Sequence, residues 1–229
     1  MGTFATMITG TAIPTHMTDD ADLLTLLQWL SPVFPVGGYA YSHGLETAVA
    51  EGDVASAEGL SAWVGFVLER GAGLSDAVLL TSAMGAEADI DALNDWASAL
   101  AASAERWQET HEQGAAFTRA VNAVTGRAAA EVALPVAVGR AAADLSIPPE
   151  RVASLYLQAF ATNLVIGAVR HVPLGQAEGQ RVIAALQPVI LAVAGRATEM
   201  APEDNRGAAF GADLAAIRHE TQDERIIRT

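Results

Sequence analysis

The sequence predicts an all-α fold, a single-domain bundle of about eight to ten helices. Apolar residues recur at three-and-four spacing in segment after segment, while the alternation typical of strands is scarce. Hydrophobic residues make up 51% of the 229 positions and charged residues 17%, which is enough apolar material for a core. No Ser/Gly/Pro-rich linker divides the chain, so we expect one helical domain (21–216) between a flexible leader (1–20) and a C-terminal tail (217–229).

Residues that favour helix ends place most of the helices. The first helix is expected to follow the Thr-Asp-Asp sequence at 18–20 and to end at the Ser-Pro pair at 31–32. Ser56 is expected to cap the N-terminus of a second helix, which Gly71 closes. Further helices are expected at about 76–86, 90–100, 105–125, 128–142, 149–170, 177–199 and 203–216.

Two of these helical patterns contain a proline. Pro135 and Pro188 each remove a backbone hydrogen bond and crowd the preceding turn, so each is expected to end or kink its helix and to leave a broken helix at that place.

Composition excludes several functions. The 13 basic residues are all arginines, so a P-loop lysine, a Schiff base and a catalytic lysine are excluded. The chain has no cysteine, which removes thiol nucleophiles, disulfides and zinc–cysteine sites. A net charge of -14 repels phosphate backbones, so we expect no nucleic-acid partner.

The histidines are not spaced as metal ligands. No two of them stand at the separations that place two imidazoles on one metal, so we expect no metal site and no cofactor. Each is expected to be a surface or capping residue: His16, His43, His111, His171 and His219.

One segment must be tested against a membrane span. Residues 152–169 are 18 uncharged positions in a row. Ser154, Gln158 and Thr162 are spaced four apart and form a polar stripe along one helix face, which favours a buried core helix over a lipid-facing one. The N-terminus lacks the basic and apolar regions of a secretory signal, so we expect a cytoplasmic protein with no membrane partner.

The most informative stretch is the elbow, which we define as residues 31–46, SPVFPVGGYAYSHGLE. It contains two prolines and three glycines between two helical stretches, and such a run continues neither helix. An elbow of this kind holds Tyr39 and Tyr41 in fixed directions.

The end of the elbow has two interpretations. Ala-Tyr-Ser-His-Gly fits a variant of the hydrolase nucleophile elbow, with Ser42 as the nucleophile, but that motif needs a strand directly before the serine. The alternative is that Ser42 is the N-cap of a helix starting at Gly44, with Glu46 near the positive end of the helix dipole.

Three segments resemble the urease accessory protein UreF family. The elbow and its continuation (31–49) match the family signature Ser-Pro-x-x-Pro-Val-Gly-x-Tyr-x-Tyr-Ser-x-Gly-Leu-Glu-x-Ala-Val. Residues 173–182 match its Pro-Leu-Gly-Gln turn, and residues 218–228 match an Arg-His-Glu sequence followed by an arginine and a bulky apolar pair. Ile217 stands where a methionine is usual in the family, and Asp223-Glu224 and residues 226–229 replace its more aromatic and serine-ending tails. The resemblance covers the chain from about residue 23 onward.

The resemblance implies a dimeric accessory protein, not an enzyme, that serves nickel insertion into apo-urease. Its partners would be UreD (also called UreH), the GTPase UreG and apo-urease, and it would couple the GTP state to nickel transfer. The tail at 217–229 would dock on a partner, since its Ile-Ile pair exposes apolar groups in water. The implied partner-binding residues are Tyr39, Tyr41, Ser42, Gly44, Glu46, Arg218, His219, Glu220 and Arg225. From composition alone, a generic dimeric helical adaptor with no urease role stays open.

Overall fold

The structure is a computed structural model, which describes residues 16–38, 43–170, 174–205 and 207–221. Every regular element in these ranges is helical and none is a strand, so the all-α prediction is confirmed. In chain order the elements are α1 (His16–Trp29), α2 (Leu45–Ala50), α3 (Ala57–Arg70), α4 (Ala72–Ala83), α5 (Ile90–Ala99), α6 (Ala104–Thr125), α7 (Leu134–Ala142), α8 (Pro149–Val169), α9 (Gln176–Ala197), the 3₁₀ turn η2 (Pro202–Asp204) and α10 (Phe210–His219).

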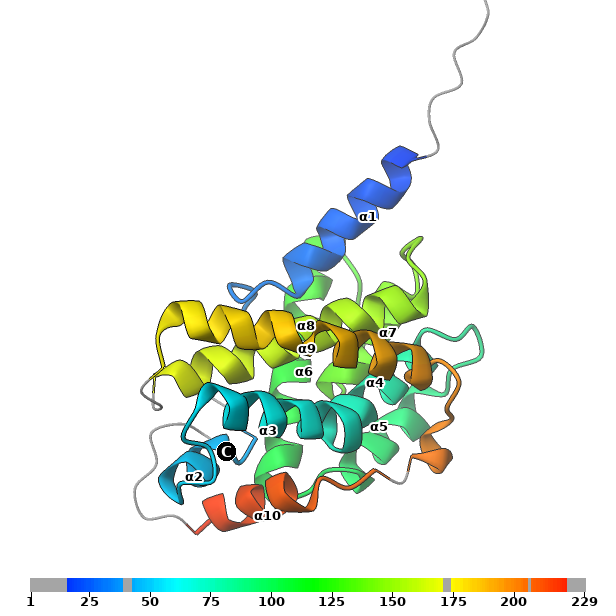
Figure 1. Cartoon of the computed structure of the whole chain (residues 1–229). Coiled ribbons are helices and arrows are strands. Elements are labelled where there is room, and N and C mark those ends of the chain that lie inside the picture. The colour runs from blue at the N-terminus through cyan, green and yellow to red at the C-terminus, as the bar shows by residue number, and fades with distance from the viewer. Residues whose placement is uncertain (1–15, 39–42, 171–173, 206, 222–229) are drawn as a thin grey trace, which may run out of the picture.

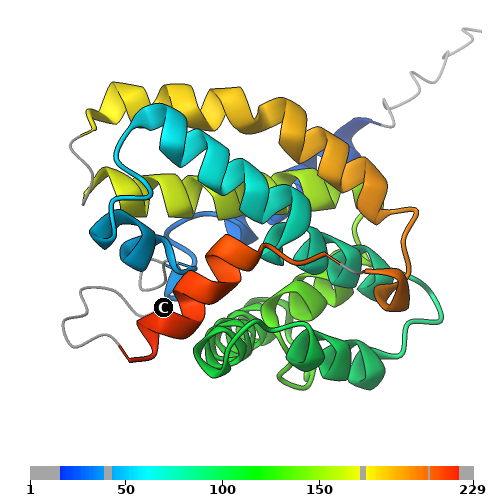
Figure 2. The ribbon, with the colours of Figure 1, turned by 60° about the horizontal axis from the view of Figure 1, so that its bottom comes forward.

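Helix α4 lies at the centre of the bundle. It packs against α3, α5, α7, α8 and α9, while α8 and α9 form a long hairpin and α6 packs on α7 (Figure 1). Helix α1 projects from this body and is anchored by its last turns, where Leu26 and Trp29 are buried. At the opposite side of the body, α10 lies across the ends of α2 and α6 (Figure 2).

Helix α8 is a core helix of this bundle. Within the described part of the chain it is the one helix whose length and composition would allow it to cross a membrane, and half of its most apolar window is buried inside the protein. The predicted polar stripe is satisfied within the helix, because Thr162 Oγ1 donates to the carbonyl of Gln158 and Ser154 Oγ donates to that of Arg151.

Both predicted ends of α3 are confirmed. The side chain of Ser56 accepts a hydrogen bond from the Gly59 N–H at 3.1 Å, and Gly71 follows the last residue of the helix. The predicted start of the first helix was wrong, because α1 already begins at His16. The last helix is displaced as well, since α10 spans Phe210–His219, whereas the pattern expected at 203–216 includes part of η2 and the non-helical residues 205 and 207–209.

Neither of the two prolines divides one helix into two. Pro135 stands in the first turn of α7, where no intrahelical donor is lost, and residues 128–133 are not helical. Helix α9 runs through Pro188 without interruption. Both Pro188 and Ala184, whose carbonyl loses its intrahelical partner, are exposed, so that carbonyl is open to solvent.

Helices α4 and α7 approach so closely that only glycine fits between them. A Cβ on Gly139 would collide with the carbonyl oxygen of Leu80 and would lie 2.9 Å from the Cβ of Ala83. We predict that Gly139→Ala lowers the free energy of unfolding by about 1–3 kcal/mol, because the two helices must separate. The matched control is Gly167→Ala in α8, where the new methyl would meet no described atom within 4 Å and the loss of chain entropy in the unfolded state stabilises by up to ~1 kcal/mol. Urea unfolding measures both, and equal effects would contradict the close approach.

Candidate partner-docking site at the elbow and the C-terminal helix

Two segments that are far apart in the sequence meet at Gly44. Its φ is +75°, in the left-handed region, and a Cβ there would lie 2.7 Å from the Ala216 nitrogen and 2.9 Å from the Ala212 oxygen. The residue that starts α2 therefore touches the backbone of α10, and glycine is required both by the φ angle and by the contact. Figure 2 shows α10 lying beside α2.

Gly44 also corrects the predicted helix cap. Helix α2 begins at Leu45 with Gly44 at the N-cap position, and no side chain caps it there. Ser42, the predicted cap, lies outside the described residues, as do Tyr39 and Tyr41. Glu46 stands in the first turn of α2, as expected for a carboxylate near the positive end of a helix.

The described part of the elbow is built of turns. Phe34 donates its backbone N–H to the Ser31 carbonyl at 2.9 Å, and residues 31–38 contain no strand. The hydrolase interpretation of Ser42 needs a strand leading into the serine, so the described residues before it do not support that interpretation.

His219 links α10 to two other helices. Its side chain is 0% exposed. Its Nδ1 lies 3.0 Å from Glu105 Oε2 at the start of α6, and its Nε2 lies 3.4 Å from Glu46 Oε2 in α2. The expectation that each histidine is a surface or capping residue is therefore wrong for His219.

The residues on either side of His219 extend this link. Glu220 Oε1 accepts a hydrogen bond from the Glu105 N–H at 3.2 Å, and so caps the first turn of α6. Arg218 pairs with Glu51 at 3.0 Å, and both side chains are about half exposed. We call the cluster formed by Gly44, Glu46, Glu105, His219 and Glu220 the C-terminal joint. The structure thus brings together all the predicted site residues that it describes: Gly44, Glu46, Arg218, His219 and Glu220.

The elbow is fastened to α6 at both ends. At its start, the ring of Phe34 packs against Phe117 with a centroid separation of 5.6 Å, and the ring of Trp29, at the end of α1, packs against Phe117 at 6.1 Å. At its end, His43 Nε2 lies 3.3 Å from Glu109 Oε1. Helix α6 therefore holds the elbow at two points, through an apolar contact at Phe34 and a polar contact at His43.

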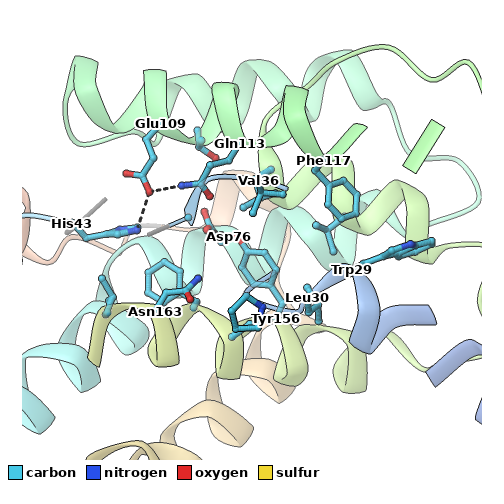
Figure 3. A pocket seen from close by; sticks show the side chains of 18 of the residues that line it. Trp29, Leu30, Val36, His43, Asp76, Glu109, Gln113, Phe117, Tyr156 and Asn163 are labelled. Atoms are coloured by element: carbon cyan, nitrogen blue, oxygen red, sulfur yellow. Dashed lines mark hydrogen bonds and ion pairs between the residues drawn. The ribbon is translucent and has the colours of Figure 1, made fainter. Parts of the chain in front are cut away.

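A polar cluster lies beneath the elbow (Figure 3). Glu109 pairs with Arg106 and accepts a hydrogen bond from Gln113 Nε2 at 2.9 Å. These side chains line a cavity of about 80 Å³ between α6, α8 and the elbow. Sequence reasoning missed this cluster, although a signal was present. Arg106, Glu109 and Gln113 continue the helical spacing of the buried Phe117, so polar residues occupy a buried face.

His43 is neutral within this cluster. Burial, and after it the charge of Arg106, lowers the pKa of His43 well below its usual value. The neutral ring donates its Nε2–H to Glu109 and stands edge-on to Phe160, with centroids 4.6 Å apart. Its Nδ1 is buried and has no hydrogen-bond partner in the described part of the protein. His43 is therefore a partly buried structural residue, which corrects the prediction of a surface position.

Asp76 of α4 has a raised pKa. Tyr156 donates its hydroxyl to Asp76 Oδ2 at 2.7 Å. Burial raises the pKa of Asp76 to about 6, and the hydrogen bond and the charge of Arg106 oppose the rise. Burial and then Asp76 itself raise the pKa of Tyr156 well above its usual value. The carboxyl of Asp76 thus changes charge in the mildly acidic range.

The fold and these contacts define an all-helical protein in which charged side chains join separate segments of the chain. Within the described residues, no three His, Asp or Glu side chains converge as metal ligands. The model of the UreF family matches residues 54–187, more than half of the chain.

Relatives agree with this match over almost the whole length. A urease accessory protein UreF from Cereibacter sphaeroides is 54% identical over 207 residues, which cover 90% of this chain and 98% of the relative. The UreF of a Jannaschia species is 51% identical, covering 90% and 94%, and that of Paracoccus denitrificans is 49% identical, covering 94% and 100%. The chain belongs to the urease accessory protein UreF family. The names of these relatives describe accessory proteins and indicate no catalytic activity.

The contact between α2 and α10 can be tested with two glycines of the same conformation. Gly44 and Gly52 both have positive φ, +75° and +84°. An alanine at either position costs about 1–2 kcal/mol of stability through its backbone. We predict that Gly44→Ala costs a further 1–3 kcal/mol or so, because its methyl meets α10, whereas at Gly52 it would meet no described atom within 4 Å. Urea unfolding of both variants decides this, and equal losses would show that α10 does not rest on Gly44.

The raised pKa of Asp76 predicts a pH-dependent gain from Asp76→Asn. The folded pKa lies above the ordinary value of 3.8, so the wild type loses stability as the pH rises from about 4 through about 6. The change corresponds to at most about 3 kcal/mol. Asparagine keeps an oxygen for the Tyr156 hydroxyl and cannot ionise. The free energy of unfolding of the variant, relative to the wild type, should therefore rise between pH 4 and pH 7. A difference that stays constant over this range would contradict the assignment.

Proposed function

We propose that this chain is required for the insertion of nickel into apo-urease, and that it acts by assembling other proteins. In this proposal it holds UreD (UreH) and the GTPase UreG next to apo-urease and couples the GTP state to nickel transfer. Nickel and GTP chemistry belong to the partners, because the chain has no lysine for a P-loop and no cysteine. Membership of the UreF family and the names of its relatives as urease accessory proteins support this role.

The C-terminal joint is the observation that carries the proposal. The predicted docking residues Tyr39, Tyr41 and Ser42 are followed directly by His43 and Gly44, and Gly44 touches α10. The tail that contains Arg225 continues from the end of α10. Both predicted docking segments are thus connected to one cluster of described residues, which favours a single docking surface over two independent ones.

The assembled state of the protein belongs to the same proposal. We propose that it works in the cytoplasm as a homodimer and without a cofactor of its own. A generic helical adaptor with no urease role is the alternative. Co-purification of the chain with UreD, UreG and apo-urease tests the proposal directly. If cells that lack this chain still produce fully active urease when nickel is scarce, the adaptor is the better description.

Arg225 gives a residue-level prediction. A guanidinium forms two parallel hydrogen bonds to a carboxylate or to backbone carbonyls while keeping its charge. We predict that Arg225→Ala lowers the amount of UreD and UreG recovered with the chain by tenfold or more. The melting temperature of the variant should equal that of the wild type.

Arg119 provides a matched control. Its side chain is 62% exposed and pairs with Glu131 on the surface at 2.8 Å, away from the C-terminal joint. Arg119→Ala removes the same charge from the chain, so it should leave recovery of the partners at the wild-type level. If both variants recover the partners equally well, Arg225 has no special role in assembly.

A further inference from the structure

A second cavity lies between α6, α7 and the connection that joins them, toward the opposite end of α6 from the C-terminal joint (Figure 1). Its volume is about 300 Å³. That is the lower end of the range of small-molecule sites, roughly 300–1,000 Å³. The apolar part of its lining consists of Phe117, Val121, Ala129, Ala137 and Ala141.

The connection that closes this cavity is held in place by α6. Asn122 Nδ2 donates to the carbonyl of Ala129 at 3.0 Å, and its Oδ1 accepts the Ala129 N–H at 3.1 Å. Both polar atoms of this side chain are therefore used to fix the connection. The cavity is formed before any ligand enters it.

Two arginines cross the cavity in opposite directions. Arg127, in the connection, pairs with Asp144 beyond the end of α7, with Nη2 and Oδ2 2.7 Å apart. Arg140, in α7, donates from Nη2 to the carbonyl of Ala130 in the connection at 2.6 Å. Both side chains line the cavity.

Arg140 supplies a positive charge that no carboxylate among the described residues pairs with. Burial lowers its pKa, but a guanidinium stays charged at neutral pH. Asp144 offsets the charge of Arg127, so the lining as a whole carries one net positive charge. A partly buried cation without a counter-charge is costly, and this one occurs in a chain of net charge -14. The lining therefore favours an anion with one negative charge.

Thr118 adds an unused hydrogen-bond donor to the same lining. It is 3% exposed, and its Oγ1 has no partner among the described residues. Thr125, two turns further along α6, shows the usual arrangement, because its Oγ1 donates to the carbonyl of Val121 at 2.7 Å. A buried hydroxyl without a partner is destabilising unless a ligand satisfies it.

We propose that this cavity binds a small organic monocarboxylate, whose oxygens accept hydrogen bonds from Arg140 and Thr118 and whose apolar body lies against Val121 and Ala141. A planar guanidinium suits a carboxylate, and the apolar lining suits a short hydrocarbon chain. Inorganic phosphate fits less well, because it has no apolar part and carries more than one charge near neutral pH. The site belongs to this chain alone and goes beyond its proposed role in urease maturation.

The test is a titration of the full chain with acetate, butyrate and inorganic phosphate, at constant pH and with sodium chloride keeping the ionic strength constant. Backbone NMR shifts of residues 117–122 and 137–141 report binding. We expect butyrate to saturate with a Kd that is roughly millimolar or tighter. Its two additional methylene groups should make it bind about tenfold more tightly than acetate.

Two substitutions of lining residues separate ligand binding from a structural role. Arg140→Gln should weaken butyrate binding by about tenfold or more, because it removes the charge. Thr118→Val should weaken it by about three- to tenfold. Valine replaces a hydroxyl that has no partner, so the ligand-free Thr118→Val variant should be at least as stable to urea as the wild type.

Two further variants provide a change of opposite sign and a control. Asp144→Asn frees Arg127 from its ion pair, so butyrate should bind several-fold more tightly. Arg119 follows Thr118 in the chain, but its side chain is 62% exposed and pairs with Glu131. Arg119→Gln removes the same charge as Arg140→Gln and should leave the Kd of butyrate at the wild-type value.

Three results would overturn the proposal. One is the absence of saturable shifts with butyrate, and another is phosphate binding more tightly than butyrate. The third is an equal effect of Arg140→Gln and Arg119→Gln on the Kd. None of these measurements involves UreD, UreG or urease, so the proposed function can fail while this inference stands.

Discussion

The positive charge of Arg106 is the constraint on which the polar interior of this protein depends. Arg106 is 8% exposed. It is buried in a chain whose acidic residues outnumber its basic ones by two to one, 27 against 13. The same charge lowers the pKa of His43 and opposes the rise that burial causes in the pKa of Asp76, Tyr156 and Asp213. The last three residues lie on α4, α8 and α10, so one guanidinium acts on side chains from three helices as well as on the elbow. Buried carboxylates without a nearby cation would be strongly destabilising.

Helix α6 carries both this charge and the apolar contacts of the elbow, because its two halves differ in the side chains of their buried face. Its C-terminal half carries Phe117, whose ring meets Trp29 and Phe34 in the apolar core. Its N-terminal half carries Arg106 and Glu109 on the continuation of the same buried face. Apolar contacts tolerate sliding, whereas hydrogen bonds and ion pairs are directional. The start of the elbow is therefore fixed by packing, and its end is fixed in orientation by polar contacts.

Features that depend only on residues close together in the sequence, such as helix caps, could be predicted from the sequence. Ser56 caps α3 because a hydroxyl three residues before a free N–H needs no tertiary contact. The outcome at Pro188 could not be predicted, because it depends on which face of α9 the bundle leaves in water. The burial of His219 depends on carboxylates more than 100 residues away in the chain, and so no spacing rule reveals it. Gly44 could be identified as part of a turn, but its contact with α10 is a property of the assembled bundle.

The same contacts explain why the elbow and the C-terminal helix form one unit. At Gly44 the two backbones touch, and at His219 a buried side chain joins α10 to both α2 and α6. Buried polar contacts of this kind favour one arrangement over its neighbours, because a small displacement leaves a donor or a charge unsatisfied. Two segments connected in this way cannot move independently. If a protein binds one segment more tightly in one arrangement of the C-terminal joint, its binding shifts the other segment toward that same arrangement. By linkage, a second protein bound to the other segment then changes the affinity of the first protein by the same factor.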